Sequence, residues 1–214
     1  MKHRNIWKNL SVCILTLLPQ AVHADFFKSQ TTLIENNYPR LSYGIAVTDF
    51  DGDGLQEFIV SGFGYPNLAL RMVNKRFVNV VHDALFADAT RNTIGVAACD
   101  VNGDGKEELY FLNTDTYSGI KKLGDRLLGR AQQTYDMFEL TKNHHMVNRT
   151  AGRSVACVDR RGNGQYGIYV ANYGGPSRLY EVEGSLISDV APELGIDAIT
   201  GGRAVVSGHI LGKQ

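Results

Sequence analysis

The chain alternates between short apolar runs and segments rich in Asp, Asn and Gly, and this alternation repeats. Three apolar runs end at an aspartate, and a fourth ends at a histidine in the same place. These end positions are Asp49, Asp100, Asp159 and His209, and they lie about 50–60 residues apart. A period of this length, with several short strands in each unit, is typical of β-propeller blades. The pattern therefore predicts an array of blade-like repeats.

Each repeat is expected to contain four short antiparallel strands. The first strand precedes the Asp/Gly segment, and the second follows it, as at Phe58-Ile59-Val60. A turn of Gly, Pro and Asn comes next, and two further runs close the unit, as in the hairpin around Asn74-Lys75. Four antiparallel strands form one propeller blade. We therefore predict an all-β fold, an incomplete β-propeller of about three four-stranded blades (FG-GAP/VCBS repeats) plus one starting strand of a fourth.

The repeats also set the expected boundaries along the chain. The predicted segments are a signal peptide at 1–24, an N-terminal segment at 25–42, repeat 1 at 43–91, repeat 2 at 92–150, repeat 3 at 151–199 and the start of a truncated repeat 4 at 200–214. Repeat 2 is the least regular, and 114–124 is interpreted as an insertion in it. Its outer strands are placed near Arg126–Arg130 and Thr134–Phe138, with a short helix over Leu127–Leu140 as the alternative.

The N-terminus has the order of a secretory signal peptide. Basic residues precede an apolar run at 10–18, and Val22-His23-Ala24 then offers small residues for cleavage, with the mature chain starting at Asp25. An uncleaved anchor helix is the alternative, but the apolar run is about half of the ~20 residues that a membrane span needs. We predict secretion into the extracellular space or matrix, without a membrane span.

The charges of the whole chain balance, with 22 Lys and Arg against 22 Asp and Glu. Removal of the basic signal peptide leaves a slight excess of acid. The sequence contains no basic run and no acidic tail. Nucleic acids and anionic membrane surfaces are therefore not expected as partners.

Two cysteines remain after the signal peptide, and one sequon is present. Cys99 and Cys157 precede their loop aspartates by one and two residues respectively. Because side chains alternate between the two faces of a strand, we expect these cysteines to point in opposite directions, to stay unpaired and to be buried as small apolar residues. The tripeptide Asn148-Arg149-Thr150 is a glycosylation sequon, which predicts an exposed loop with a glycan on Asn148.

Two of the Asp/Gly segments have the pattern of a calcium-binding loop. Oxygen-bearing side chains stand at positions 1, 3 and 5, Gly stands at position 6 and Glu at position 9. Calcium prefers about six to eight oxygen ligands, and a tight loop with alternating carboxylates brings such ligands to one point. The predicted ligands are the side chains of Asp49, Asp51, Asp53 and Glu57 with the Leu55 carbonyl, and the side chains of Asp100, Asn102, Asp104 and Glu108 with the Lys106 carbonyl. We therefore predict about two Ca²⁺ ions and no other cofactor.

Two other interpretations of these loops are less favoured than a calcium site. An EF-hand needs Glu at position 12 and flanking helices, but Val60 and Phe111 stand there and the flanks are rich in β-formers. A metal-free Asp/Gly turn is less favoured because the pattern recurs at the same phase of two repeats. In the third loop Arg161 and Gly167 replace two of the acids, so this loop is expected to be metal-free, with Arg161 paired to Asp159.

The sequence contains no recognisable catalytic pattern. Gly-x-Ser-x-Gly, His-Glu-x-x-His and phosphate-binding loops are absent. The adjacent pair His144-His145 has no third ligand nearby in the sequence, so a transition-metal site there is not favoured. We therefore predict no catalytic residue and no enzymatic activity.

The repeats resemble the FG-GAP/VCBS propeller repeats found in integrin α-subunit heads, and they are more similar to the cartilage acidic protein family of secreted matrix and neural proteins. The similar segments are Leu41–Asp49, Ile94–Asn113, Ala151–Tyr173 and Thr200–Arg203. The resemblance implies a seven-bladed propeller, structural calcium, extracellular residence, and roles in matrix or in axon guidance through receptor antagonism. Family members continue through further blades, an ASPIC-type segment and often an EGF-like module, so this sequence is expected to be a truncated form or a partial gene model.

The combined expectation is a secreted, calcium-binding, non-enzymatic module that binds an extracellular protein or a cell-surface receptor. The alternatives are a propeller-type hydrolase or lyase, and a decoy fragment that regulates a full-length paralogue. An open arc of blades exposes the flanks of its first and third blades, at Phe58–Val60 and Ile168–Val170. Because exposed apolar flanks favour association, the chain is also expected to self-associate or to pair with a full-length relative.

Overall fold

The structure is a computed structural model that describes residues 27–81 and 83–208. The predicted signal peptide, 1–24, and His209 lie outside the described residues. The chain divides into two compact units, Met1–Gln30 and Thr31–Gln214. The second unit contains all of the regular secondary structure described below.

Most of the regular structure in this unit is β-strand, arranged as three antiparallel sheets. The first sheet consists of β1 (Ile45–Thr48), β2 (Glu57–Val60), β3 (Leu68–Val73) and β4 (Arg76–Asn79). The second consists of β5 (Thr93–Cys99), β6 (Glu108–Asn113), β7 (Arg126–Arg130) and β8 (Thr134–Asp136). The third consists of β9 (Gly152–Val158), β10 (Gly167–Pro176), β11 (Arg178–Glu183) and β12 (Leu186–Asp189), and β13 (Ile199–Gly201) pairs with the far end of β10.

Four short helices accompany the strands in the described part of the chain. They are η1 (Thr31–Leu33), α1 (Ala84–Ala87), η2 (Met137–Glu139) and η3 (His144–Met146). The strands β7 and β8 lie where the sequence placed the outer strands of repeat 2, so the alternative helix over Leu127–Leu140 is wrong. None of the helices in the described residues is long and apolar enough to span a membrane.

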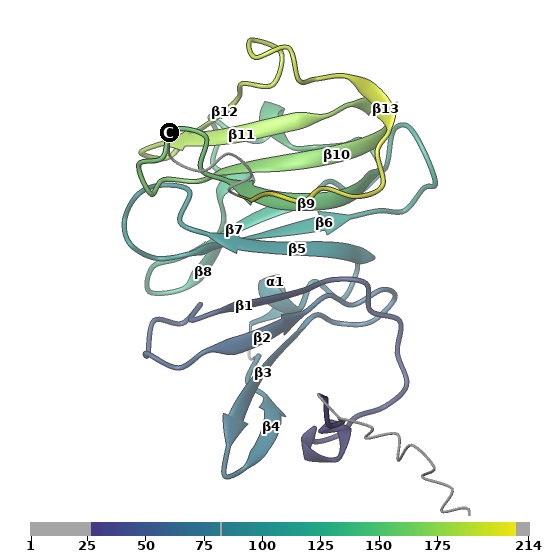
Figure 1. Cartoon of the computed structure of the whole chain (residues 1–214), viewed down its shortest axis with the longest axis vertical. Coiled ribbons are helices and arrows are strands. Elements are labelled where there is room, and N and C mark those ends of the chain that lie inside the picture. The colour runs from purple at the N-terminus through teal and green to yellow at the C-terminus, as the bar shows by residue number, and fades with distance from the viewer. Residues whose placement is uncertain (1–26, 82, 209–214) are drawn as a thin grey trace, which may run out of the picture. The chain divides into compact units, whose positions relative to one another are not determined.

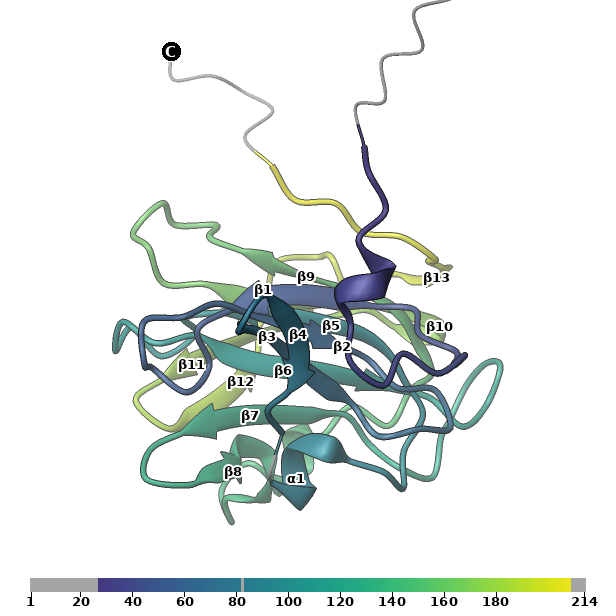
Figure 2. The same ribbon diagram turned by 90° about the horizontal axis from the view of Figure 1, so that it is seen from below.

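The sheets stack in chain order, with the β5–β8 sheet between the other two (Figure 1). Their first strands, β1, β5 and β9, lie along one edge of the stack, and β8 lies with α1 at the opposite edge (Figure 2). Each sheet follows its strands in sequence order, β1-β2-β3-β4 and so on, which is the meander of a propeller blade. The structure therefore agrees with the predicted all-β, incomplete propeller.

The central blade buries both of its faces, and this explains its continuous apolar strand. All six residues of β6 are buried. Leu109 and Phe111 pack in a cluster with Ile59 of the first blade, whereas Tyr110 and Leu112 pack in a cluster with Ile168 of the third. Because alternate residues of a strand point to opposite faces, a strand with two covered faces has no position for an exposed side chain.

The hairpin predicted around Asn74-Lys75 is present between β3 and β4. Both residues have positive φ, 49° for Asn74 and 65° for Lys75. Two successive residues with positive φ form the type I′ turn, whose twist matches that of paired strands. Asparagine tolerates this conformation better than most residues, which is why the dipeptide identifies the turn in the sequence.

The cysteine prediction is wrong, because Cys99 and Cys157 form a disulfide, with their Cα atoms 6.3 Å apart. The two residues do lie on opposite faces of equivalent strands. However, the blades are stacked, so the face of β5 that carries Cys99 is directed at the face of β9 that carries Cys157. Because opposite faces of successive blades meet, cysteines on opposite faces of equivalent strands come together and can form a disulfide.

The exposure predicted for the two flanks holds for only one of them. In the first blade Phe58 is 37% exposed, and its neighbours on the same face, Ile45 and Val47, are 62% and 50% exposed. In the third blade Ile168 and Val170 are fully buried, because they face the second blade. The described chain therefore has an exposed apolar flank on the first blade, whereas on β10 the residue that faces away from the second blade, Tyr169, is half-buried.

Candidate metal-binding loops

All three Asp/Gly loops are built on the same backbone arrangement. The aspartate at position 1 accepts hydrogen bonds from backbone N–H groups of the loop that follows it. The glycine at position 6 has a positive φ between 84° and 89° in each loop, and its N–H donates to that aspartate at 2.8 Å. A side chain at this position would be strained, so glycine is required there. The aspartates and glycines are Asp49 and Gly54, Asp100 and Gly105, and Asp159 and Gly164.

The first two loops are each closed by a buried glutamate at the start of the second strand. Glu57 is 2% exposed and Glu108 is 3% exposed. One carboxylate oxygen of each accepts a backbone N–H, from Phe50 at 3.1 Å and from Val101 at 3.0 Å. The second oxygen of each accepts from a further side chain, which is Arg71 on β3 for Glu57 and Asn102 of the loop itself for Glu108. A buried carboxylate needs a positive partner to stay ionised, so the two loops differ according to what supplies it.

In the first loop the acids converge on one point. Asp49, Asp51 and Glu57 each bring a carboxylate oxygen within 4.8 Å of the others, so this cluster could hold a metal ion. Arg71, on β3, forms ion pairs with Asp51, Asp53 and Glu57. Burial raises the pKa of Glu57 and outweighs the opposing effect of Arg71. Burial also acts to raise the pKa of Asp51, but its hydrogen bond from Arg71 lowers it overall.

In the second loop no basic side chain of the described residues forms an ion pair with the acids. Instead, the amide nitrogen of Asn102 donates to Glu108 at 2.9 Å and to Asp104 at 3.4 Å. Burial, with the nearby charges of Asp104 and Asp100, raises the pKa of Glu108 to about 7. A cation bound next to Glu108 would lower this pKa and favour the ionised carboxylate.

The donor sets of both loops fit calcium, a hard ion that prefers oxygen ligands. In the second loop, the amide nitrogen of Asn102 is directed at Glu108 and Asp104 while its oxygen accepts the N–H of Asp104, so the amide must rotate to bring its oxygen toward the acids. The predicted backbone ligands Leu55 and Lys106 lie within their loops, and their N–H groups donate to Asp53 and Asp104. Among the described residues, three acids converge only in the first loop, whereas in the second loop Asn102 links Asp104 to Glu108. The coordination of calcium by either loop stays a prediction.

The third loop has a different ion pair from the one predicted. Arg161 pairs with Glu181 on β11 at 2.8 Å, and Arg160 pairs with the same carboxylate. The expected partner, Asp159, has its two oxygens occupied by the backbone N–H groups of its loop, and the hydrogen bond from Gly164 is the main reason that its pKa is lowered. The acid that neutralises Arg161 comes from the third strand and cannot be identified within the loop sequence.

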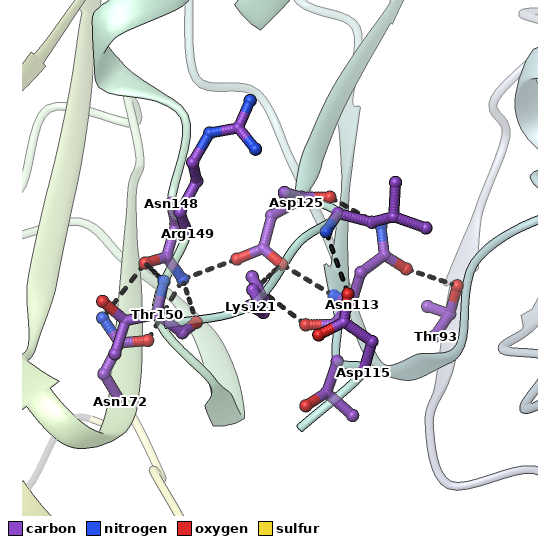
Figure 3. Close-up of polar contacts among 12 residues, drawn as sticks. Thr93, Asn113, Asp115, Lys121, Asp125, Asn148, Arg149, Thr150 and Asn172 are labelled. Carbon is purple, nitrogen blue, oxygen red and sulfur yellow. Dashed lines mark hydrogen bonds and ion pairs between the residues drawn. The ribbon is translucent and has the colours of Figure 1, made fainter. Parts of the chain in front are cut away.

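The structure also contains a buried polar network that the sequence did not indicate (Figure 3). Lys121 lies in the predicted insertion, is buried, and forms an ion pair with Asp125 while donating to the Asn113 carbonyl at 2.7 Å. Asp125 also accepts from the Tyr110 hydroxyl at 2.7 Å and from the Asn148 amide at 2.6 Å. Because Asn148 in turn bonds to Asn172 on β10, the network joins the second blade to the third.

The predicted exposure of the sequon is therefore wrong. Asn148 is fully buried, and its side-chain nitrogen donates to Asp125 and Asn172. That nitrogen is the atom to which an N-linked glycan would be attached. A glycan and the Asp125–Asn148–Asn172 network exclude each other in the folded chain.

We expect Asn148 to be unmodified in the folded protein. When the chain is expressed through a eukaryotic secretory pathway, treatment with an N-glycosidase should leave its mass unchanged. Replacement of Thr150 by Val removes the sequon but keeps Asn148, and it serves as the control for the mass. A glycan found on Asn148 of the folded protein would show that the buried network does not form as described.

Blades of four antiparallel strands, each with an Asp/Gly loop between its first and second strands, define a repeat protein of the propeller type. Residues 49–111, which include the first two loops, match the family of FG-GAP-like repeats. The chain is 43% identical to human cartilage acidic protein 1 over 205 residues and 40% identical to the Xenopus tropicalis protein over 202 residues. These alignments cover 84% and 83% of this chain, and in both cases the chain spans 31% of the length of the relative. The resemblance to FG-GAP-like repeats and to the cartilage acidic protein family is therefore confirmed.

Proposed function

We propose that this chain is a secreted, calcium-binding, non-enzymatic module of the extracellular matrix or the cell surface. Its first two Asp/Gly loops hold calcium, and the ions fix the loops at the rim of the blades. An extracellular protein or a cell-surface receptor is the proposed partner. A role in axon guidance by receptor antagonism follows only from the resemblance to the cartilage acidic protein family and is proposed on that ground.

The second loop carries the calcium proposal. Glu108 is buried, its pKa is raised to about 7, and within the described residues it has an amide but no basic side chain as its loop partner. Around it lie Asp100, Asn102 and Asp104, which together supply the oxygen-rich set that calcium prefers. A divalent cation at this point would offset the repulsion among the acids and the cost of burying Glu108.

Extracellular residence is supported by three separate features. The N-terminal sequence has the order of a secretory signal peptide. The similar proteins carry the name cartilage acidic protein 1. The bond between Cys99 and Cys157 is of a kind that persists in oxidising compartments and is rare in the cytosol.

A binding rather than a catalytic role is supported by the surface of the first blade. Ile45, Val47 and Phe58 form an exposed apolar face on β1 and β2. Apolar side chains gathered on one face are typical of protein contact surfaces. The charged residues of the loops are engaged in backbone hydrogen bonds and ion pairs, which suits a structural role for them.

We expect the replacement of Glu108 by Gln to weaken calcium binding at the second loop by about 100-fold or more. Glu108 is a proposed direct ligand, and the loss of an outer-shell partner alone already costs about 10–100-fold in metal affinity. Glutamine keeps the size of the side chain but removes its charge. The measurement is a calorimetric titration of calcium into the mature chain. The matched control is Asp159→Asn in the third loop, which should leave calcium binding unchanged. Wild-type protein that binds no calcium at extracellular concentrations would refute the proposed function.

A further inference from the structure

On the third strand of each blade, one position faces the Asp/Gly loop, and the residue at this position differs in every repeat. The strand registers identify the equivalent positions, because Phe58 pairs with Leu70, Leu109 with Leu128 and Ile168 with Tyr180. The residue after each of these partners on the third strand occupies the position over the loop. These residues are Arg71 on β3, Gly129 on β7 and Glu181 on β11.

In two of the three repeats, the side chain at this position carries a charge opposite to that of the loop. In the first repeat Arg71 pairs with the acidic loop, through Asp51, Asp53 and Glu57. In the third repeat the signs are reversed, because Glu181 pairs with Arg161, which stands at the same loop position as Asp51. Both loops thus obtain their counter-charge from within the chain.

The second repeat has no counter-charge at this position. Gly129 carries no side chain, and a Cβ built there would lie 2.7 Å from the ring of Tyr135. An uncharged ring therefore occupies the space that a longer side chain at position 129 would need. Among the described residues, the acids of the second loop have the uncharged Asn102 amide, and no cation, as a side-chain partner.

The guanidinium of Arg71 binds the acids in the way that a loop cation would. Its Nε donates to Glu57 at 2.8 Å, one terminal nitrogen donates to Asp53 at 2.6 Å, and the other pairs with Asp51. The side chain is 13% exposed. Burial tends to lower the pKa of Arg71, but the hydrogen bond to Asp51 and the charge of Glu57 raise it overall, so the cation is permanent.

The first loop also has a place to which the guanidinium can withdraw. A cavity of about 530 Å³ lies beside it, lined among others by Phe50, Asp51, Arg71 and Arg130. Arg130 already places its guanidinium over the Phe50 ring, 5.9 Å from the ring centre. An arginine side chain can therefore leave the acids and remain next to polar and aromatic groups without a change of the backbone.

We propose that Arg71 is a built-in counter-cation of the first loop, which competes with calcium there and makes this loop the weaker of the two calcium sites. The proposal rests on the proposed function, since it assumes that the loops bind calcium. The two loops, although similar in sequence, then differ in how their acids are neutralised. The second loop depends on calcium for its positive charge, whereas the first keeps its acids neutralised in the absence of calcium.

The test is a calorimetric calcium titration of wild-type protein and of the variants Arg71→Gln and Arg130→Gln. Arg71→Gln is expected to strengthen the weaker site by about tenfold, within the usual range of coupling between competing ligands, and to leave the stronger site unchanged. Arg130→Gln removes a nearby charge that forms no ion pair with the loop acids, and it should change either affinity by far less. Adding Asp51→Asn to Arg71→Gln should abolish the strengthened site and so assign it to the first loop.

The outcomes separate this inference from the proposed function. Calcium binding at the second loop with no gain in Arg71→Gln would overturn the counter-cation role and leave the proposed function intact. Absence of calcium binding in all variants would overturn both. If Arg71→Gln does not fold without calcium, thermal unfolding of Arg71→Lys decides. Lysine keeps the charge but lacks the planar fork that binds several carboxylates at once, so it should compete less with calcium. Calcium should then stabilise Arg71→Lys more than it stabilises the wild type, and equal stabilisation would contradict the proposal.

Discussion

Replacing Lys121 with Met is expected to lower the free energy of unfolding by about 3–5 kcal/mol. Lys121 and Asp125 are both completely buried, and each is the charged partner of the other. Methionine fills a similar volume but leaves Asp125 ionised and uncompensated in the interior between the second and third blades. Burial already lowers the pKa of Lys121, and Asp125 opposes this effect, so the ammonium depends on its partner. Chemical denaturation followed by circular dichroism measures the change.

The neighbouring residue and the partner provide controls for this prediction. Lys122→Met removes an exposed lysine next in the chain and should change the free energy of unfolding by less than about 0.5 kcal/mol. The double variant Lys121→Met with Asp125→Asn removes both charges, so it should be less destabilised than the sum of the single variants. A loss of under about 1 kcal/mol in Lys121→Met would contradict a buried, paired lysine.

Removing the disulfide by Cys99→Ser and Cys157→Ser together is expected to cost about 4 kcal/mol. The bond closes a loop of 58 residues, and the entropy that it removes from the unfolded chain grows with the logarithm of that number. It also joins the first strands of the second and third blades, where the cores of the two blades meet. Equilibrium unfolding of the double variant and of the oxidised wild type gives the difference.

The same bond makes a chemical prediction that is independent of stability. The denatured, unreduced wild-type chain should contain no free thiol between residues 25 and 214, and reduction should release two. Either single variant, Cys99→Ser or Cys157→Ser, is the control and should show one free thiol. Two free thiols in the unreduced mature monomer would rule out the disulfide.

The sequence was sufficient for those features that depend on neighbouring residues. Apolar alternation placed the strands, and Asn74-Lys75 placed a hairpin turn, because strand formation and turn geometry are encoded over a few residues. The glycines of the Asp/Gly loops were identified for the same reason. The resemblance to FG-GAP-like repeats rests on these local patterns too.

Features that depend on the stacking of blades were missed or wrongly predicted. The pairing of Cys99 with Cys157 requires knowledge of which faces meet, and strand alternation alone supplied the opposite conclusion. Asn148 was placed on the surface because a sequon is a local pattern, whereas its burial comes from contacts with Asp125 and Asn172. Nothing in the polar composition of 114–124 indicated that Lys121 would be buried.

The partners of the loops were also beyond the reach of local patterns. Arg71 and Glu181 lie on third strands, 14 to 21 residues from the loop side chains that they neutralise. Their place over the loops follows from the register of the second and third strands, which the sequence does not give directly. With the register known, however, the alternation of Arg, Gly and Glu at equivalent positions can be recognised in the sequence.

The most direct test of calcium as the organising ion of these loops is anomalous diffraction from crystals of the mature chain grown in calcium. We expect a peak of anomalous density in the second loop, surrounded by the side-chain oxygens of Asp100, Asn102, Asp104 and Glu108. A weaker peak is expected in the first loop, and none in the loop of Asp159. A fully ordered second loop without anomalous density, at calcium concentrations typical of the extracellular space, would contradict the account.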